Sequence, residues 1–98
     1  MGDRRVLRRF LSVAAVGLFA ALPMPAAKAA DPGFCREYAA TALRQFHAAF
    51  DAPRCRMGMN GARWSSEFRV HYDWCLGAPY RAAREEQEAR GRYIYACR

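Results

Sequence analysis

The chain has 98 residues and a formal net charge of +7. This length leaves room for one small domain. Five of the sixteen basic residues precede residue 30, so the rest of the chain keeps eleven arginines against eight acidic residues, a net charge near +3. Such a modest excess argues against nucleic acid as a partner, because that binding depends on many phosphate contacts.

The first 29 residues have the pattern of a signal peptide. Four arginines lie within residues 1–9, an apolar run covers residues 10–22, and Pro23 ends it. Ala27 and Ala29 present small side chains at the positions that a signal peptidase reads, which predicts cleavage after Ala29. A retained membrane anchor would need about 20 apolar residues, and this run has thirteen. We therefore expect a periplasmic or secreted protein of residues 30–98 with no stable membrane anchor. General export is the default, although Arg8 and Arg9 leave a twin-arginine signal open.

Four cysteines follow the predicted cleavage site, at positions 35, 55, 75 and 97. An even number of cysteines in a short exported chain predicts a disulfide framework. None of them stands in a C-x-x-C pair, which argues against a thioredoxin-like redox centre, a zinc ribbon and a c-type haem. A chain of this size forms only a marginal core, so disulfides have a structural purpose here.

The first predicted helix runs from Pro32 to about Phe50. Asp31 is a capping residue and Pro32 suits the first helical position. Residues 51–53 end the helix, and residues 54–61 are predicted to form a loop. One apolar face repeats at steps of three and four residues, formed by Cys35, Tyr38, Ala42, Phe46 and Ala49.

A second helix is predicted over residues 62–76, with Asn60 as its cap and Gly77 as a left-handed residue that ends it. Its apolar face consists of Trp64, Phe68, His71, Tyr72 and Cys75.

A third helix is predicted to start near Pro79, and we expect it to be the least buried of the three, with its end held by Cys97. Its middle is polar and contains Gly91, and Glu86–Arg90 and Glu88–Arg92 have the spacing of ion pairs. One face carries Ala83, Gln87, Arg90, Ile94 and Cys97.

These elements predict an all-α, three-helix, up-down-up domain. The helix lengths then limit which cysteines can pair. The first helix spans about 25 Å at 1.5 Å per residue, whereas bridged Cα atoms lie within about 7 Å. Pairing Cys35 with Cys55 or Cys97 would join opposite ends of the domain. The prediction is therefore Cys35–Cys75 with Cys55–Cys97.

Several short motifs resemble a group of small cysteine-containing exported bacterial proteins. The motifs are C-x-x-Y-A at residues 35–39, R-W at 63–64, H-x-x-W-C at 71–75, and the final Cys97. The resemblance covers most of the chain after residue 29. It implies a helical, disulfide-linked exported domain, and it implies no activity.

The segment Cys55-Arg56-Met57-Gly58-Met59 is the one ligand-like cluster in the sequence. Thiolate and thioether sulfurs suit Cu(I), so periplasmic binding of this soft metal through Cys55, Met57 and Met59 is one functional hypothesis. Under the structural interpretation, Cys55 is half of a disulfide and the two methionines cover a small core.

His71 lies on the apolar face of the second predicted helix, where a histidine acts either as a base or ligand, or as a core residue bound to a backbone carbonyl. We favour the core role. The sequence contains no Ser/His/Asp or Cys/His arrangement, no phosphate-binding glycine loop and no H-E-x-x-H. We therefore predict a protein that is not an enzyme and uses no cofactor.

The chain after residue 29 contains eleven aromatic residues, more than so small a domain can bury. We expect Trp64, Phe68 and Phe46 to face inward, and Trp74, Tyr80 and one of Tyr93 and Tyr95 to lie near the surface. Exposed Trp, Tyr and Arg are enriched at binding hot spots. Trp74, Tyr80 and Arg81 are thus the predicted binding residues, for an envelope protein or glycan. The alternative is that these rings cover a thin core.

Overall fold

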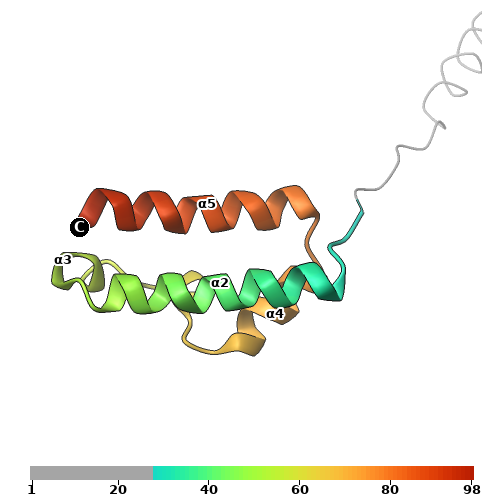
Figure 1. Cartoon of the computed structure of the whole chain (residues 1–98), viewed down its shortest axis with the longest axis horizontal. Coiled ribbons are helices and arrows are strands. Elements are labelled where there is room, and N and C mark those ends of the chain that lie inside the picture. Colours follow the sequence, from blue (N-terminus) through green and yellow to red (C-terminus); the bar gives the residue numbers. More distant parts are fainter. Residues whose placement is uncertain (1–27) are drawn as a thin grey trace, which may run out of the picture.

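The computed structural model describes residues 28–98 as a helical domain (Figure 1). Its elements are α2 (Pro32–Phe50), the short α3 (Pro53–Arg56), the 3-10 turn η1 (Ala62–Trp64), α4 (Phe68–Leu76) and α5 (Tyr80–Cys97). Within these residues there is no β-strand, only an isolated bridge between Ala29 and Pro79. None of the described helices is both long and apolar enough to cross a membrane. The predicted signal peptide falls almost entirely outside the described residues.

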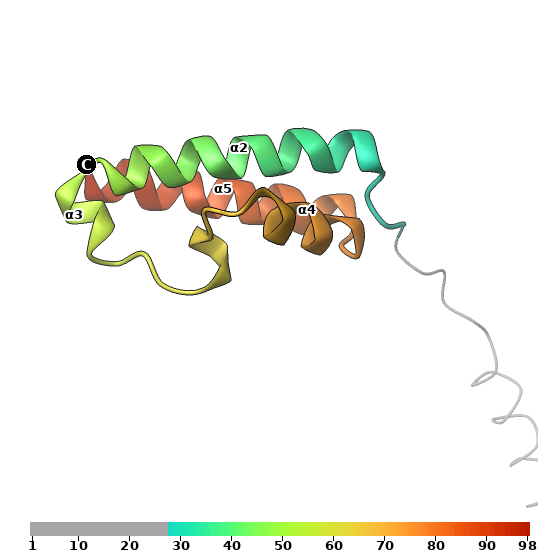
Figure 2. The same cartoon turned by 90° about the horizontal axis from the view of Figure 1, so that it is seen from below.

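The up-down-up order is confirmed. Figures 1 and 2 show α2 and α5 side by side and running in the same direction, while η1 and α4, which lie between these two helices in sequence, run back the other way. α2 packs against both α4 and α5, which makes it the central helix.

The first helix begins and ends as the sequence predicts, at Pro32 and Phe50. The Asp31 side chain accepts a hydrogen bond of 2.8 Å from the Phe34 backbone N–H, which satisfies one of the donors that a helix leaves free at its start. The expected face is buried as well, since Cys35, Tyr38, Ala42 and Ala49 are inaccessible and Phe46 is half-buried.

Two apolar clusters form the core, and each contains one disulfide. At the start of α2, Cys35–Cys75 lies with Ala30, Tyr38 and Ala83. At the end of α2, Cys55–Cys97 lies with Ala49, Trp64 and Ile94. The paired Cα atoms are 5.5 and 5.1 Å apart, within the range that a disulfide spans. The predicted pairing is confirmed.

The second predicted helix is wrong in its extent, because residues 62–76 form two pieces rather than one. Ser65 adopts an extended backbone, and its hydroxyl oxygen accepts a hydrogen bond from the Glu67 backbone N–H. A serine that binds a nearby backbone group in this way competes with helix formation. The break leaves Phe68, expected inside, 38% exposed.

The predicted helix ends also need correction. Residues 54–56, expected in a loop, belong to α3, which begins at Pro53. η1 begins after Gly61, with a positive φ of 82°, rather than with a cap from Asn60. Gly77 has a φ of −95° and is not left-handed.

Gly58 has a specific role in packing the far end of the domain. The Tyr93 hydroxyl donates a hydrogen bond of 2.5 Å to the Cys55 carbonyl. On the way it passes so close to Gly58 that a Cβ at this position would collide with the phenol oxygen. Tyr93 also packs against Trp64, with ring centroids 4.9 Å apart.

Candidate functional site

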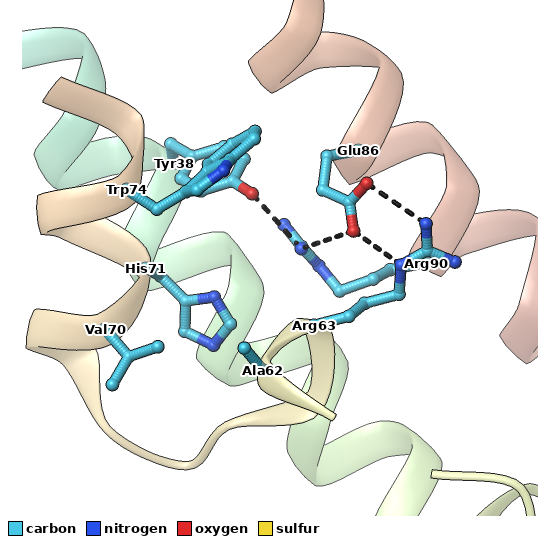
Figure 3. Close-up of a pocket in the computed structure, with 8 residues that line it drawn as sticks. All are labelled: Tyr38, Ala62, Arg63, Val70, His71, Trp74, Glu86 and Arg90. Carbon is cyan, nitrogen blue, oxygen red and sulfur yellow. Dashed lines mark hydrogen bonds and ion pairs between the residues drawn. The ribbon is translucent and has the colours of Figure 1, made fainter. Parts of the chain in front are cut away.

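A pocket of about 200 Å³ opens beside the middle of α2 (Figure 3). Figure 3 shows α4 on one side of it, with Val70, His71 and Trp74, and the charged side chains of Arg63, Glu86 and Arg90 on the other. Three of the sequence motifs meet at this pocket. Tyr38 belongs to C-x-x-Y-A, Arg63 belongs to R-W, and His71 and Trp74 both belong to H-x-x-W-C.

Arg90 is the most deeply buried charged residue of the described chain, with no accessible surface. Its Nε donates to Gln45 Oε1 at 2.8 Å, its Nη1 donates to the Tyr38 hydroxyl at 3.2 Å, and its guanidinium carbon lies 5.0 Å from the centre of the Tyr38 ring. Nη2 is buried and donates to no acceptor within residues 28–98. Arg90 therefore joins the middle of α5 to the middle of α2, and its Nη2 can still donate a hydrogen bond.

Glu86 is the acidic group of the pocket, and both arginines contact it. Arg63 binds it with two hydrogen bonds, from Nε at 2.5 Å and from Nη2 at 3.1 Å. This paired geometry raises the pKa of Arg63, chiefly through the hydrogen bonds to Glu86. Arg90 Nη1 lies 3.9 Å from the same carboxylate, which confirms the predicted Glu86–Arg90 pair.

His71 is held by the break between η1 and α4. Its Nε2 lies 2.8 Å from the Ser65 carbonyl oxygen, so this nitrogen carries the proton and donates it. Burial is the main cause that lowers the pKa of His71, and the charge of Arg90 lowers it further. The predicted core position, with a ring nitrogen bound to a backbone carbonyl, is confirmed. The ring also lines the pocket as a neutral imidazole.

Two aromatic rings form one end of the pocket. Tyr38 is buried, and Trp74 lies over it with ring centroids 5.6 Å apart. Burial is the main cause that raises the pKa of the Tyr38 phenol, so it stays protonated at neutral pH. Trp74 is 46% exposed, as expected from the sequence, and one part of its ring remains open to solvent beside the pocket.

The other two predicted binding residues lie outside the pocket lining. Tyr80 packs edge-on against Phe34, 4.9 Å between centroids, and its hydroxyl donates to the Asp31 carboxylate. Arg81 is exposed and forms an ion pair of 3.3 Å with Glu85, one turn further along α5. Of the three, the structure therefore places Trp74 alone at the pocket.

The Cys55, Met57 and Met59 segment is divided among different environments. Cys55 is buried and bonded to Cys97, so its sulfur supplies no thiolate. Met57 is 86% exposed, and Met59 is half-buried against the cluster around Trp64. Under the soft-metal hypothesis, this segment can therefore offer a metal only the two thioether sulfurs of Met57 and Met59.

Sequence reasoning placed Arg90 on one face of the third helix, which it expected to be the least buried, and did not identify it as a site residue. The signal was present, because a charged residue stood in line with Ala83, Ile94 and Cys97. Charged side chains are seldom fully buried unless paired, and this position should have directed attention to Tyr38, Gln45 and Glu86.

No family model, curated protein or solved structure matches the chain.

Proposed function

We propose that this protein is an exported, non-catalytic binding module of the bacterial envelope, and that the pocket beside Trp74 is its binding site. The observation that carries the proposal is the combination of a half-exposed tryptophan and a fully buried arginine with a free donor at the same pocket. Tryptophan and arginine are the residue types that most often dominate binding energy.

The chemistry of the pocket supports binding rather than catalysis. His71 Nε2 is engaged with the Ser65 carbonyl, and the Glu86 carboxylate is neutralised by two arginines. A general base must be free to reach the proton that it removes. Export is supported by the two disulfides, since these bonds persist in oxidising compartments such as the periplasm and the exterior.

A capture experiment tests this function. The exported protein, purified with both disulfides formed, is immobilised and exposed to an extract of the cell envelope. We expect it to retain a partner, and Trp74→Ala to weaken the affinity by about 2 kcal/mol, more than tenfold. The matched control is Tyr95→Ala, which removes an aromatic side chain that is 89% exposed and does not line the pocket.

Each variant is checked by circular dichroism and by thermal unfolding, because Trp74 also packs on Tyr38. Arg81→Ala, in the same assay, shows whether the binding surface extends to the start of α5. Equal retention by the native protein and a folded Trp74→Ala variant would contradict the proposed site.

A further inference from the structure

The ligand class can be inferred from the donor that the fold leaves free at the pocket. A buried N–H without an acceptor costs about 1–3 kcal/mol, and Arg90 Nη2 is such a group. The other two nitrogens of the guanidinium are held by Gln45 and Tyr38, so its orientation is fixed before any ligand arrives. Nη2 itself has less than 1 Å² of accessible surface, so an acceptor in the pocket reaches it only when a side chain of the lining moves aside, and that contact would relieve the cost.

The charges of the pocket favour a ligand with one negative charge. Arg63 and Arg90 are positive, Glu86 is negative, and His71 is neutral because burial lowers its pKa. The lining therefore carries one net positive charge. The two hydrogen bonds from Arg63 also hold the Glu86 carboxylate in an ion pair, which reduces its repulsion of an incoming anion. A carboxylate matches this balance, and guanidinium groups bind carboxylates well.

The size and the aromatic wall indicate what carries that carboxylate. At about 200 Å³ the pocket is smaller than the roughly 300–1,000 Å³ typical of drug-sized ligands. Trp74 offers a half-exposed ring, and Val70, one turn earlier on α4, is 37% exposed beside it. The C–H face of a sugar ring packs on such an aromatic surface, and one sugar unit suits the volume.

We propose that the pocket binds a uronic acid unit of an envelope polysaccharide, with its carboxylate at Arg90 Nη2 and its ring against Trp74. The proposal rests on the proposed function for the location of the site. It adds the ligand class, which the capture experiment does not identify.

A titration with free sugars tests the ligand class on the intact, disulfide-bonded protein. The Nε–Hε signal of Arg90 is followed by NMR during addition of sodium glucuronate. We expect a saturable shift, and binding at least about tenfold weaker for methyl glucoside, which lacks the charge. Inorganic phosphate and a short peptide with a free C-terminal carboxylate are titrated in parallel. Tighter binding of either one than of glucuronate would overturn the proposal.

A pair of variants isolates the charge of the ligand from the shape of the pocket. Val70→Glu and Val70→Gln place side chains of nearly equal size at an exposed position of the lining. Because like charges at a few ångströms repel, the glutamate variant should bind glucuronate at least about tenfold more weakly than the glutamine variant. Equal affinities of these two folded variants, or no binding by the native protein, would show that the ligand class is wrong.

The two proposals fail in different ways. Capture of an envelope partner that depends on Trp74, together with no binding of glucuronate, would retain the function and overturn the ligand class. Binding of glucuronate that differs between the two Val70 variants, together with no partner that depends on Trp74, would retain the ligand class and overturn the function.

Discussion

The two ends of this domain differ from its middle in how the helices are joined. At one end a disulfide links α2 to α4, and at the other a disulfide links α3, which directly follows α2, to α5; each bond lies inside an apolar cluster. Between the clusters, α2 and α5 are joined by polar contacts of the buried Arg90 with Tyr38 and Gln45. Apolar burial and covalent links stabilise a small domain without placing strict demands on charge.

A buried charge, in contrast to apolar burial and disulfides, adds little to the stability of a domain. Its desolvation costs several kcal/mol, and its pairs often only balance that loss. The ends are therefore sufficient to hold the fold, while the middle keeps an arrangement that stability alone does not require. This difference is why we assign structure to the ends and binding to the middle.

The largest effect should come from removing a disulfide at either end. The bonds close segments of 40 and 42 residues, for which the chain-entropy model gives about 4 kcal/mol each. Replacing Cys35 and Cys75 by alanine, or Cys55 and Cys97, should lower the free energy of unfolding by similar amounts, within the range of about 2–5 kcal/mol. Urea denaturation measures both. A loss below about 1 kcal/mol at one end would show that the apolar cluster there suffices without its disulfide.

Substitutions at Arg90 should separate stability from binding. Arg90→Ala leaves a cavity and an unpaired Tyr38 hydroxyl, so we expect a loss of about 2–4 kcal/mol. Arg90→Met combined with Tyr38→Phe removes both partners of the Arg90–Tyr38 hydrogen bond and keeps the volume. Gln45 loses its bond to Arg90, but it is only half-buried and still donates to the Gln87 carbonyl, so the free energy of unfolding should change by less than about 1 kcal/mol. Glucuronate binding, followed by NMR, should be lost. If the double variant were as unstable as Arg90→Ala, the polar middle would be structural.

Prediction from sequence was most successful where local chemistry decides the outcome. The start of α2 depends on Asp31 and Pro32, and the pairing of Cys35 with Cys75 follows from helix length. The break before α4 was missed because apolar spacing at Trp64, Phe68 and His71 favours a continuous helix. The competing hydrogen bond, which the Glu67 backbone N–H donates to the Ser65 hydroxyl oxygen, becomes visible only in three dimensions.

The pocket was predicted only in part for a similar reason. Trp74 and His71 attracted attention as an aromatic and a titratable residue on one helix. Arg63, Glu86 and Tyr38 come from three other elements, and nothing in the local sequence shows that Arg63 meets Glu86, 23 residues further on. Such contacts depend on how η1, α2 and α5 pack, which periodicity does not determine.

The smallest predicted effect is a dependence of stability on pH that originates in the middle of the domain. Burial lowers the pKa of His71 below its ordinary value of 6.5, and the charge of Arg90 acts in the same direction, while Ser65 and Glu86 oppose it. As the pH falls below 6.5, the unfolded chain binds a proton that the folded protein does not yet accept. The free energy of unfolding should therefore fall until the pH is below the pKa of the folded state.

His71→Gln provides the control for this dependence, because its amide can still donate to the Ser65 carbonyl but does not titrate. Urea denaturation of both proteins between about pH 7.5 and 5 should give a free energy of unfolding that falls more steeply for the native chain. Asp31 at the end of the domain does not interfere, since its pKa is lowered from 3.8, mainly by the Phe34 backbone N–H, and its contribution is lost only at more acidic pH. Parallel pH profiles for the two proteins would mean that His71 is protonated as readily in the folded state as in the unfolded chain. An imidazole with the ordinary pKa of 6.5 would still be mostly neutral at about pH 7.5, so the charge balance of the pocket would change only below that pH.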